Sequence, residues 1–300
     1  MKLTTVLKRF LFIPALIVVS GWGMVSPARS QALVPHVLRL EPAKLTQQGL
    51  GLAQEAAQLA QFQQYELALQ RARLATQLSP KSPEIWALLG GLYLQTDSLD
   101  DGIKALRVAQ SLDANNSAVL FALGTAHFQK EKYTEAVNYI TAGLKVKPNV
   151  PGALFDLGNA YFMLRRYDDA ISQYERAIAQ DAKFWPAINN IGLINYEAGQ
   201  KDAALKRWQT AAEIDEKAAE PRLAIAVAVY TQGNQEQGLN LGEAALRLDS
   251  RYADVKFLKE NLWGDRLLED TKKLLATPRI RATVAQLQER PPQTQRPNRR

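Results

Sequence analysis

Cysteine is missing from this 300-residue chain, and its absence excludes a thiol nucleophile, a cysteine-bound metal and a disulfide. Histidine is scarce as well: His36 lies in a predicted linker, and His127 lies on an apolar helical face, where packing is the common role. The chain also lacks a glycine-rich phosphate loop and a Ser/His/Asp arrangement. We therefore expect no enzyme, no catalytic residues, no cofactor and no metal site.

A basic surface over the folded part of the chain is lacking too. The net charge of +7 comes from the two ends, because residues 1–31 contribute +4 and residues 278–300 contribute +5, which leaves −2 for residues 32–277. Nucleic acid is therefore not an expected partner. Residues 278–300 are rich in Pro, Gln and Arg and are predicted to be a mostly disordered basic tail. A solvated tail fits this composition better than one that binds anionic lipid headgroups.

Long apolar runs are confined to the N-terminus. Lys2, Lys8 and Arg9 precede an apolar stretch over residues 10–25, and small residues follow it. This order is typical of a secretory signal, and 16 residues are slightly few for a membrane span, which needs about 17–25. Residues 1–31 are predicted to be a signal peptide or an N-terminal membrane anchor, with cleavage weakly favoured. We expect a membrane-anchored or exported protein, in a periplasm or thylakoid-type lumen, and not a plain cytoplasmic one.

What the chain does have is a repeat of constant length. From Gly49 to Tyr252 the sequence divides every 34 residues, without insertion or deletion, into six similar segments. The segments are 49–82, 83–116, 117–150, 151–184, 185–218 and 219–252, after a linker over residues 32–48. A fixed period of this size indicates stacked supersecondary units, each of which depends on its neighbours to bury an apolar face.

Three columns of the repeat contain only Gly and Ala. Position 8 holds Ala56, Gly90, Gly124, Gly158, Gly192 and Ala226, and positions 20 and 27 are equally restricted. Because Gly inside a helix costs about 0.8–1.0 kcal/mol relative to Ala, its recurrence predicts a close approach of two helices. Apolar residues at positions 4, 7, 8 and 11 predict a first helix, and a second helix is expected to start near position 17.

The ends of the array differ from its middle. Glu55, Arg222 and Gly242 depart from the pattern of segments two to five, as expected of terminal repeats that face solvent on one side. After the last repeat, residues 253–277 combine leucines with charged residues and predict one capping helix that ends at Pro278. The predicted fold is all-α: a right-handed solenoid of six 34-residue helix–turn–helix repeats plus a C-terminal capping helix.

Segment four shows the most characteristic motif. It reads Gly152-Ala-Leu-Phe-Asp-Leu-Gly-Asn-Ala-Tyr161, followed by Tyr167-Asp-Asp-Ala170 and Tyr174-Glu-Arg-Ala177. These residues resemble the tetratricopeptide repeat family, and the resemblance covers roughly two thirds of the chain. It implies a scaffold for protein or peptide partners without identifying them. More loosely, the chain resembles membrane-anchored or exported bacterial repeat proteins, among them cyanobacterial ones, that assist the assembly of complexes.

The same resemblance places a binding groove along positions 2, 5, 9 and 12 of the first helices. In this chain these positions are small at the start and aromatic from segment three onward. The candidate peptide-binding residues are Phe121, Phe128, Phe155, Asn159, Phe162, Asn189, Tyr196 and Tyr230. The aromatic residues are expected to form a contiguous strip that anchors an apolar or helical partner segment, while packing against neighbouring repeats is an equally weighted role.

Three classes of function fit this sequence. The first is a non-enzymatic interaction scaffold or assembly factor at a membrane, the second a structural protein that associates with itself, and the third an envelope-associated component. The paired basic residues that would clamp an acidic peptide tail are missing from the groove positions. We take the first class as the expectation and keep a self-associating or envelope-associated protein as the alternative.

Overall fold

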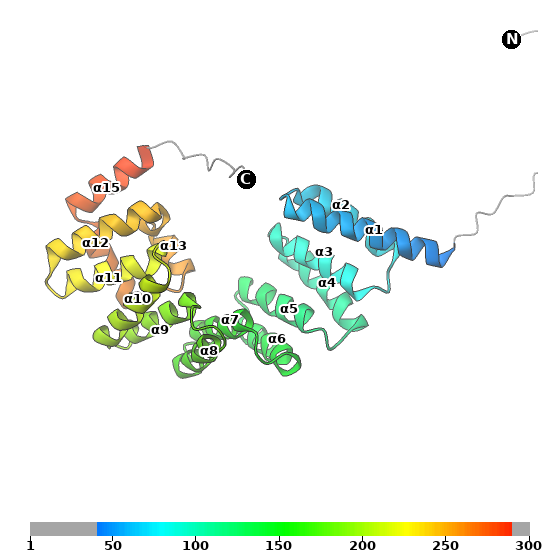
Figure 1. Ribbon diagram of the computed structural model, residues 1–300, viewed down its shortest axis with the longest axis horizontal. Helices are drawn as coiled ribbons and strands as arrows, with labels where there is room; N and C mark the ends of the chain where they lie inside the picture. The colour runs from blue at the N-terminus through cyan, green and yellow to red at the C-terminus, as the bar shows by residue number, and fades with distance from the viewer. Residues whose placement is uncertain (1–40, 290–300) are drawn as a thin grey trace, which may run out of the picture. The chain divides into compact units, whose positions relative to one another are not determined.

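The computed structural model describes residues 41–289, and every regular element within this range is a helix. Twelve of these helices form six consecutive pairs (Figure 1). The pairs are α1 (Pro42–Gln61) with α2 (Tyr65–Leu78), α3 (Pro83–Gln95) with α4 (Leu99–Leu112), α5 (Ser117–Gln129) with α6 (Tyr133–Val146), α7 (Pro151–Met163) with α8 (Tyr167–Gln180), α9 (Trp185–Glu197) with α10 (Lys201–Ile214), and α11 (Ala219–Thr231) with α12 (Gln235–Leu248).

Neighbouring helices pack against one another along this array. Each first helix contacts the second helix of its own pair, and each second helix contacts the first helix of the next pair. First helices of successive pairs also touch, as α3 does with α5 and α5 with α7. Each pair therefore buries its apolar residues against its neighbours, and the all-α solenoid expected from the repeat is confirmed.

Position 8 of the repeat is small because a larger side chain of the second helix fills the space beside it. The side chains at position 24 lie against the position-8 glycines in four pairs: Leu106 on Gly90, Ile140 on Gly124, Tyr174 on Gly158 and Trp208 on Gly192. A Cβ added to Gly90 would lie 2.6 Å from Cγ of Leu106. The predicted close approach is thus confirmed at these glycines, and each accommodates a different side chain at native packing density.

The turn inside each pair uses one left-handed residue. It stands at position 15 in all six repeats, as Gln63, Asp97, Glu131, Arg165, Gly199 and Gly233. Left-handed residues end helices by satisfying the last carbonyl groups, but a side chain there costs roughly 1–2 kcal/mol. The second helix then starts two residues later, at position 17. Sequence analysis missed this turn position because glycine stands there only in the last two repeats.

The C-terminal part differs from the single capping helix predicted over residues 253–277. The chain forms a short 3-10 helix η1 (Ser250–Ala253), then α13 (Val255–Glu260) and α14 (Asp265–Leu275). The two α-helices are separated because Leu262 is left-handed, with φ of +65°, and Gly264 adopts an extended conformation before α14.

Pro278 begins a helix instead of ending one. Proline suits the first turn, where the backbone N–H has no partner anyway, and α15 (Pro278–Glu289) follows directly. The predicted basic tail, expected to be disordered past Leu287, therefore begins with a helix that extends to Glu289. Ile280 is buried there, and Arg279 pairs with Glu236 and Glu243 of α12. Residues 290–300 lie outside the described residues.

Repeat six is covered at its outer end. Helix α15 packs against α12, and Leu274 and Ile280 fill the space beside Gly242 that a position-24 side chain occupies in repeats two to five. The departure of Gly242 from the pattern thus reflects packing against the C-terminal helices that cover this end of the array.

The N-terminal part of the array begins earlier than predicted. Helix α1 starts at Pro42, so residues 42–48 of the predicted linker are helical. Its buried Gly49 approaches Ser79, the residue that follows α2. Across residues 41–289, none of the helices has the length and apolar character that a membrane span requires. The predicted signal peptide or anchor over residues 1–31 lies outside the described residues.

Candidate functional site

Positions 2, 5, 9 and 12 of the first helices α1, α3, α5, α7, α9 and α11 are called the inner face here, because the resemblance places the groove along them. The eight candidate residues belong to this face but differ in exposure. Phe121, Phe128, Phe155, Asn159 and Tyr230 are half-buried, whereas Phe162, Asn189 and Tyr196 are buried. The expected exposed strip is therefore interrupted: Phe162 packs edge-on against Tyr167 at 5.5 Å between ring centres, and Tyr196 lies beneath another helix.

Helix α14 covers the inner face of repeats five and six, where it packs against α9 and α11. Its N-terminus is capped by Glu197 of α9, whose carboxylate accepts the backbone N–H groups of Arg266 at 3.1 Å and Leu267 at 2.9 Å. A negative charge at a helix N-terminus is favourable. Gly264 approaches Glu197 so closely that a Cβ would not fit. The C-terminal part of the predicted groove is thus filled by the chain itself.

A second polar contact holds the middle of α14. The Tyr196 hydroxyl donates to Asp270 at 2.7 Å, and Lys273 forms an ion pair with the same carboxyl group at 2.8 Å. Burial alone would raise the pKa of Asp270, but the hydrogen bonds from Lys273 and Tyr196 hold this pKa below its ordinary value. The carboxylate is therefore charged at neutral pH and binds the buried tyrosine, so Tyr196 serves the fold and is not free for a partner.

The candidate asparagines join a buried hydrogen-bond network between repeats four and five. Asn159 Oδ1 accepts from the Tyr174 hydroxyl at 2.7 Å and from Asn190 Nδ2 at 3.0 Å. Asn189 Nδ2 donates to Asn190 Oδ1 at 3.1 Å, and its backbone carbonyl accepts from Trp208 at 3.2 Å. Buried polar groups that satisfy one another fix the packing of adjacent repeats. Asn159 and Asn189 therefore position the inner face.

An open cavity of about 300 Å³ remains on the inner face beside the α13–α14 turn. Three of the predicted residues line it, namely Phe128, Phe155 and Asn159. They are joined by Trp185 and Asn190 of α9, Glu220 of α11, Tyr252 of η1 and the turn residue Leu262. The structure thus brings three central candidates together at one cavity. The other five do not line it: Phe121, Phe162, Asn189, Tyr196 and Tyr230.

Glu220 is the buried carboxylate of this cavity. It is 8 % exposed, and one of its oxygens accepts the indole N–H of Trp263 at 2.9 Å. Burial raises the pKa of Glu220 to about 7, against the opposing effect of hydrogen bonds from Trp263, Asn189 and Tyr252. No ion pair joins Glu220 to a basic side chain within residues 41–289. The group therefore lies near the midpoint of its titration at neutral pH.

Asp156 is a second carboxyl group with altered acidity on the same face. Burial raises its pKa to about 6, and its recorded side-chain hydrogen bond is a long one of 3.5 Å from the Thr125 hydroxyl. Asp156 also acts electrostatically on Tyr174, whose pKa is raised chiefly by burial. The region between α5 and α11 thus holds two acidic groups in apolar surroundings.

Sequence analysis missed Glu220 and Trp263. Glu220 occupies position 2 of repeat six, one of the four inner positions. The following residues of the same helix are mostly apolar, so an acidic residue there could have been recognised as a candidate site residue. Trp263 had no comparable signal, because it lies in the break between α13 and α14, beyond the last repeat.

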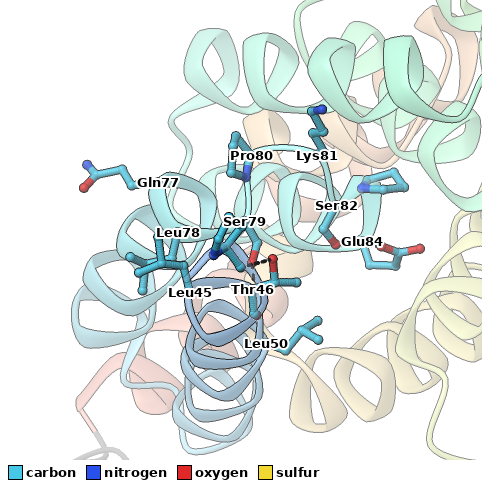
Figure 2. A pocket seen from close by; sticks show the side chains of 12 residues that line it. Leu45, Thr46, Leu50, Gln77, Leu78, Ser79, Pro80, Lys81, Ser82 and Glu84 are labelled. Atoms are coloured by element: carbon cyan, nitrogen blue, oxygen red, sulfur yellow. Dashed lines mark hydrogen bonds between the residues drawn. The ribbon is translucent and has the colours of Figure 1, made fainter. Parts of the chain in front are cut away.

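Another cavity, of about 620 Å³, lies where α1 starts and the α2–α3 turn passes (Figure 2). Its walls include the side chains of Leu45, Leu50 and Leu78, and a hydrogen bond of 3.1 Å from the Ser79 hydroxyl to the Thr46 carbonyl crosses it. The charged residues at its rim, Lys81 and Glu84, are exposed. This cavity therefore offers apolar contact but no buried charge.

His127 has the packing role expected from its position. It is 5 % exposed and stacks on Tyr139 with ring centres 5.1 Å apart. Burial lowers the pKa of His127, so the ring is neutral at pH 7. In the part of the chain that the structure describes, His, Asp and Glu residues do not gather in groups of three or more that could hold a metal ion.

Comparisons with known proteins agree with this architecture. Residues 121–183 match the family model described as tetratricopeptide repeat. The search of curated proteins found no match. Solved structures with similar folds include MamA, with 24 % identity and a TM-score of 0.51 over 55 % of this chain and 96 % of MamA. PilF from Pseudomonas aeruginosa has 15 % identity and a TM-score of 0.60 over 73 % of this chain and 97 % of PilF. MamA from Desulfovibrio magneticus RS-1 has 16 % identity and a TM-score of 0.53 over 59 % of this chain and 97 % of that protein.

Residues 121–183 match tetratricopeptide repeats, and the six helix pairs and the structural neighbours show the same repeat fold along the rest of the array. Since the identities lie below 25 %, the structural neighbours establish a shared fold and no more. Proteins built from these repeats are in general non-enzymatic modules that bind protein or peptide partners. At this level the chain is a protein–protein interaction scaffold.

Proposed function

We propose that this scaffold binds an apolar or helical segment of a partner protein on the open part of its inner face, from α3 to the cavity at α9. The observation that carries the proposal is the docking of α14. The inner face of α9 and α11 already holds an amphipathic helix, which buries Leu267, Leu268 and Leu274. The first helices of the preceding repeats have the same position in the fold, so they are suited to the same type of ligand.

The open part of the inner face ends in aromatic side chains that can anchor such a segment. Phe128 and Phe155 are half-buried and line the cavity, and Phe155 is held in place by an edge-on contact of 5.4 Å with Phe184. Aromatic anchors at the mouth of a pocket commonly dominate binding, because they bury large areas with little loss of side-chain entropy.

The membrane part of the proposal rests on the sequence of residues 1–31, which lie outside the described residues. An apolar stretch behind three basic residues supports a scaffold that works at, or across, a membrane, where it assists the assembly of partners. Self-association is the competing function, and it would use the same inner face on a second copy of the chain.

The proposal predicts that a photo-reactive phenylalanine analogue at position 128 or 155 cross-links the full chain to the same partner in its native cells. The matched control is position 112, because Leu112 ends a second helix and is 41 % exposed. Changing both Phe128 and Phe155 to Ala should weaken that partner's binding at least about tenfold, the effect of losing a modest anchor. Identical products from positions 112 and 155 would refute the proposal, and products that contain only this chain would establish self-association instead.

A further inference from the structure

The cavity on the inner face has walls that favour positive charge. Aromatic rings from four elements line it: Phe128, Phe155, Trp185 and Tyr252. Two carboxylates, Glu220 and Glu260, also line it, and no lysine or arginine is among the lining residues, although Lys256 pairs with Glu260 at 3.7 Å. The face of an aromatic ring attracts cations through its quadrupole, and a carboxylate attracts them by charge. The aromatic rings and the carboxylates therefore both favour a positively charged ligand.

Glu220 in particular lacks the partner that a buried carboxylate normally has. Asp270, buried to the same degree, has the Lys273 ammonium at 2.8 Å, whereas no basic side chain of residues 41–289 pairs with Glu220. Its hydrogen bonds come from the neutral side chains of Trp263, at 2.9 Å, and of Asn189 and Tyr252. The neighbouring Asn189 leaves its Oδ1 buried without a donor. A charge in apolar surroundings is unfavourable unless a cation and further donors are brought to it.

The chain itself shows how such a site binds an arginine. Arg251, next to Tyr252 in η1, donates to both carboxylate oxygens of Asp249 and lies 4.9 Å over the ring of Phe257. A guanidinium group is planar, so it can stack flat on a ring while two of its N–H groups bond a carboxylate, whereas a lysine ammonium acts as a point charge. Phe155 and Glu220 supply the same two kinds of surface inside the cavity, without the guanidinium.

We propose that this cavity binds the guanidinium group of an arginine in the partner segment, between the aromatic walls and the Glu220 carboxylate. This inference rests on the proposed function, since it names the side chain that the inner face takes from its partner. A cavity of about 300 Å³ has the size of a small ligand site and accommodates one long side chain. Arginine binding at Glu220 then fixes the register of the partner segment, while Phe128 and Phe155 supply apolar contact.

Fluorine NMR of the full chain with 5-fluorotryptophan tests the proposal. The chain has five tryptophans, of which Trp185 lines the cavity and Trp263 bonds to Glu220, so both resonances report on this site. The probe is N-acetyl-arginine methylamide, and the matched control is the neutral isostere N-acetyl-citrulline methylamide. We expect saturable shifts of the Trp185 and Trp263 resonances with the arginine probe, and at least tenfold weaker binding of the citrulline probe.

Two variants locate the effect. Glu220→Gln keeps an acceptor for Trp263 and should weaken the arginine probe at least tenfold. Glu84→Gln, which removes the exposed carboxylate at the same position of repeat two, should leave binding unchanged. Equal affinity for the two probes in the unaltered chain, or no saturable shift with arginine, would overturn the proposal. If a partner cross-links at positions 128 and 155 but the arginine probe does not bind, this inference alone is rejected. If the arginine probe binds but no partner cross-links at these positions, the proposed function is rejected.

Discussion

Trp263→Ala is expected to lower the free energy of unfolding of repeats five and six by about 3–5 kcal/mol, the range for truncating a large buried aromatic side chain. Trp263 is 3 % exposed and donates to Glu220 across 43 residues of sequence. Its loss removes packing at the start of α14 and takes one hydrogen-bond donor from the buried Glu220 carboxylate. Since α14 covers α9 and α11, backbone amides of these two helices should exchange hydrogen faster, whereas those of α3 should not.

Two further variants separate the causes of this loss. Trp263→Phe retains most of the buried ring area and removes the donor, so it should cost about 1–3 kcal/mol. Phe62→Ala changes a side chain that is 75 % exposed and should stay within about 0.5 kcal/mol of the original chain. Urea unfolding together with hydrogen exchange measures all three, because a repeat array need not unfold as one unit. Equal losses for Trp263→Ala and Phe62→Ala would show that the C-terminal segment does not support the repeats.

Gly90→Ala and Gly91→Ala are expected to change stability in opposite directions, although the two glycines are neighbours in α3. A Cβ at Gly90 would meet Leu106 at 2.6 Å and the Gly102 carbonyl oxygen at 3.2 Å, so the two helices must separate, at a cost of about 1–3 kcal/mol. A Cβ at Gly91 meets no atom within 4 Å, so the higher helix propensity of alanine should stabilise the chain by about 0.8–1.0 kcal/mol.

Thermal unfolding followed by circular dichroism measures both changes. The pair is its own control, because both substitutions add one methyl group to the same helix and differ only in the face that receives it. Destabilisation by both variants, or by neither, would contradict the register in which position 8 faces the second helix.

The repeat array could be predicted from the sequence because its information is local and periodic. The first helices start at Pro83, Ser117, Pro151, Trp185 and Ala219, the first residues of the segments marked by the 34-residue period. Glycine at position 8 signalled the contact with the second helix for the same reason, since one packing problem recurs along the chain. The C-terminal helices do not follow the 34-residue period. The residue that separates α13 from α14 is the left-handed Leu262, and leucine is not a residue type that predicts a left-handed conformation.

The sequence predicted those site residues whose position depends on one helix alone, and it missed those whose environment depends on distant parts of the chain. Spacing put Phe128 and Phe155 on one stripe of the first helices, the family resemblance assigned that stripe to the groove, and both residues line the cavity. The burial of Tyr196 depends on Asp270, 74 residues away, and the environment of Glu220 depends on Trp263. These contacts arise where the chain after the last repeat folds back on the array, which no local pattern of the repeats encodes.

The central claim, that the C-terminal segment covers the inner face of repeats five and six, is tested most directly by a disulfide. The natural chain has no cysteine, so Glu197→Cys with Gly264→Cys introduces a unique pair. A Cβ at Gly264 would approach Cγ of Glu197, the atom that Sγ replaces in the cysteine variant, so the two cysteines lie within reach of a disulfide, whose Cβ atoms are about 3.5–4.5 Å apart. The control pair keeps Glu197→Cys and places the second cysteine at the exposed Glu269. Under mild oxidation the first pair should cross-link almost completely while the control remains reduced; equal cross-linking of the two pairs, or none in the first, would contradict this account.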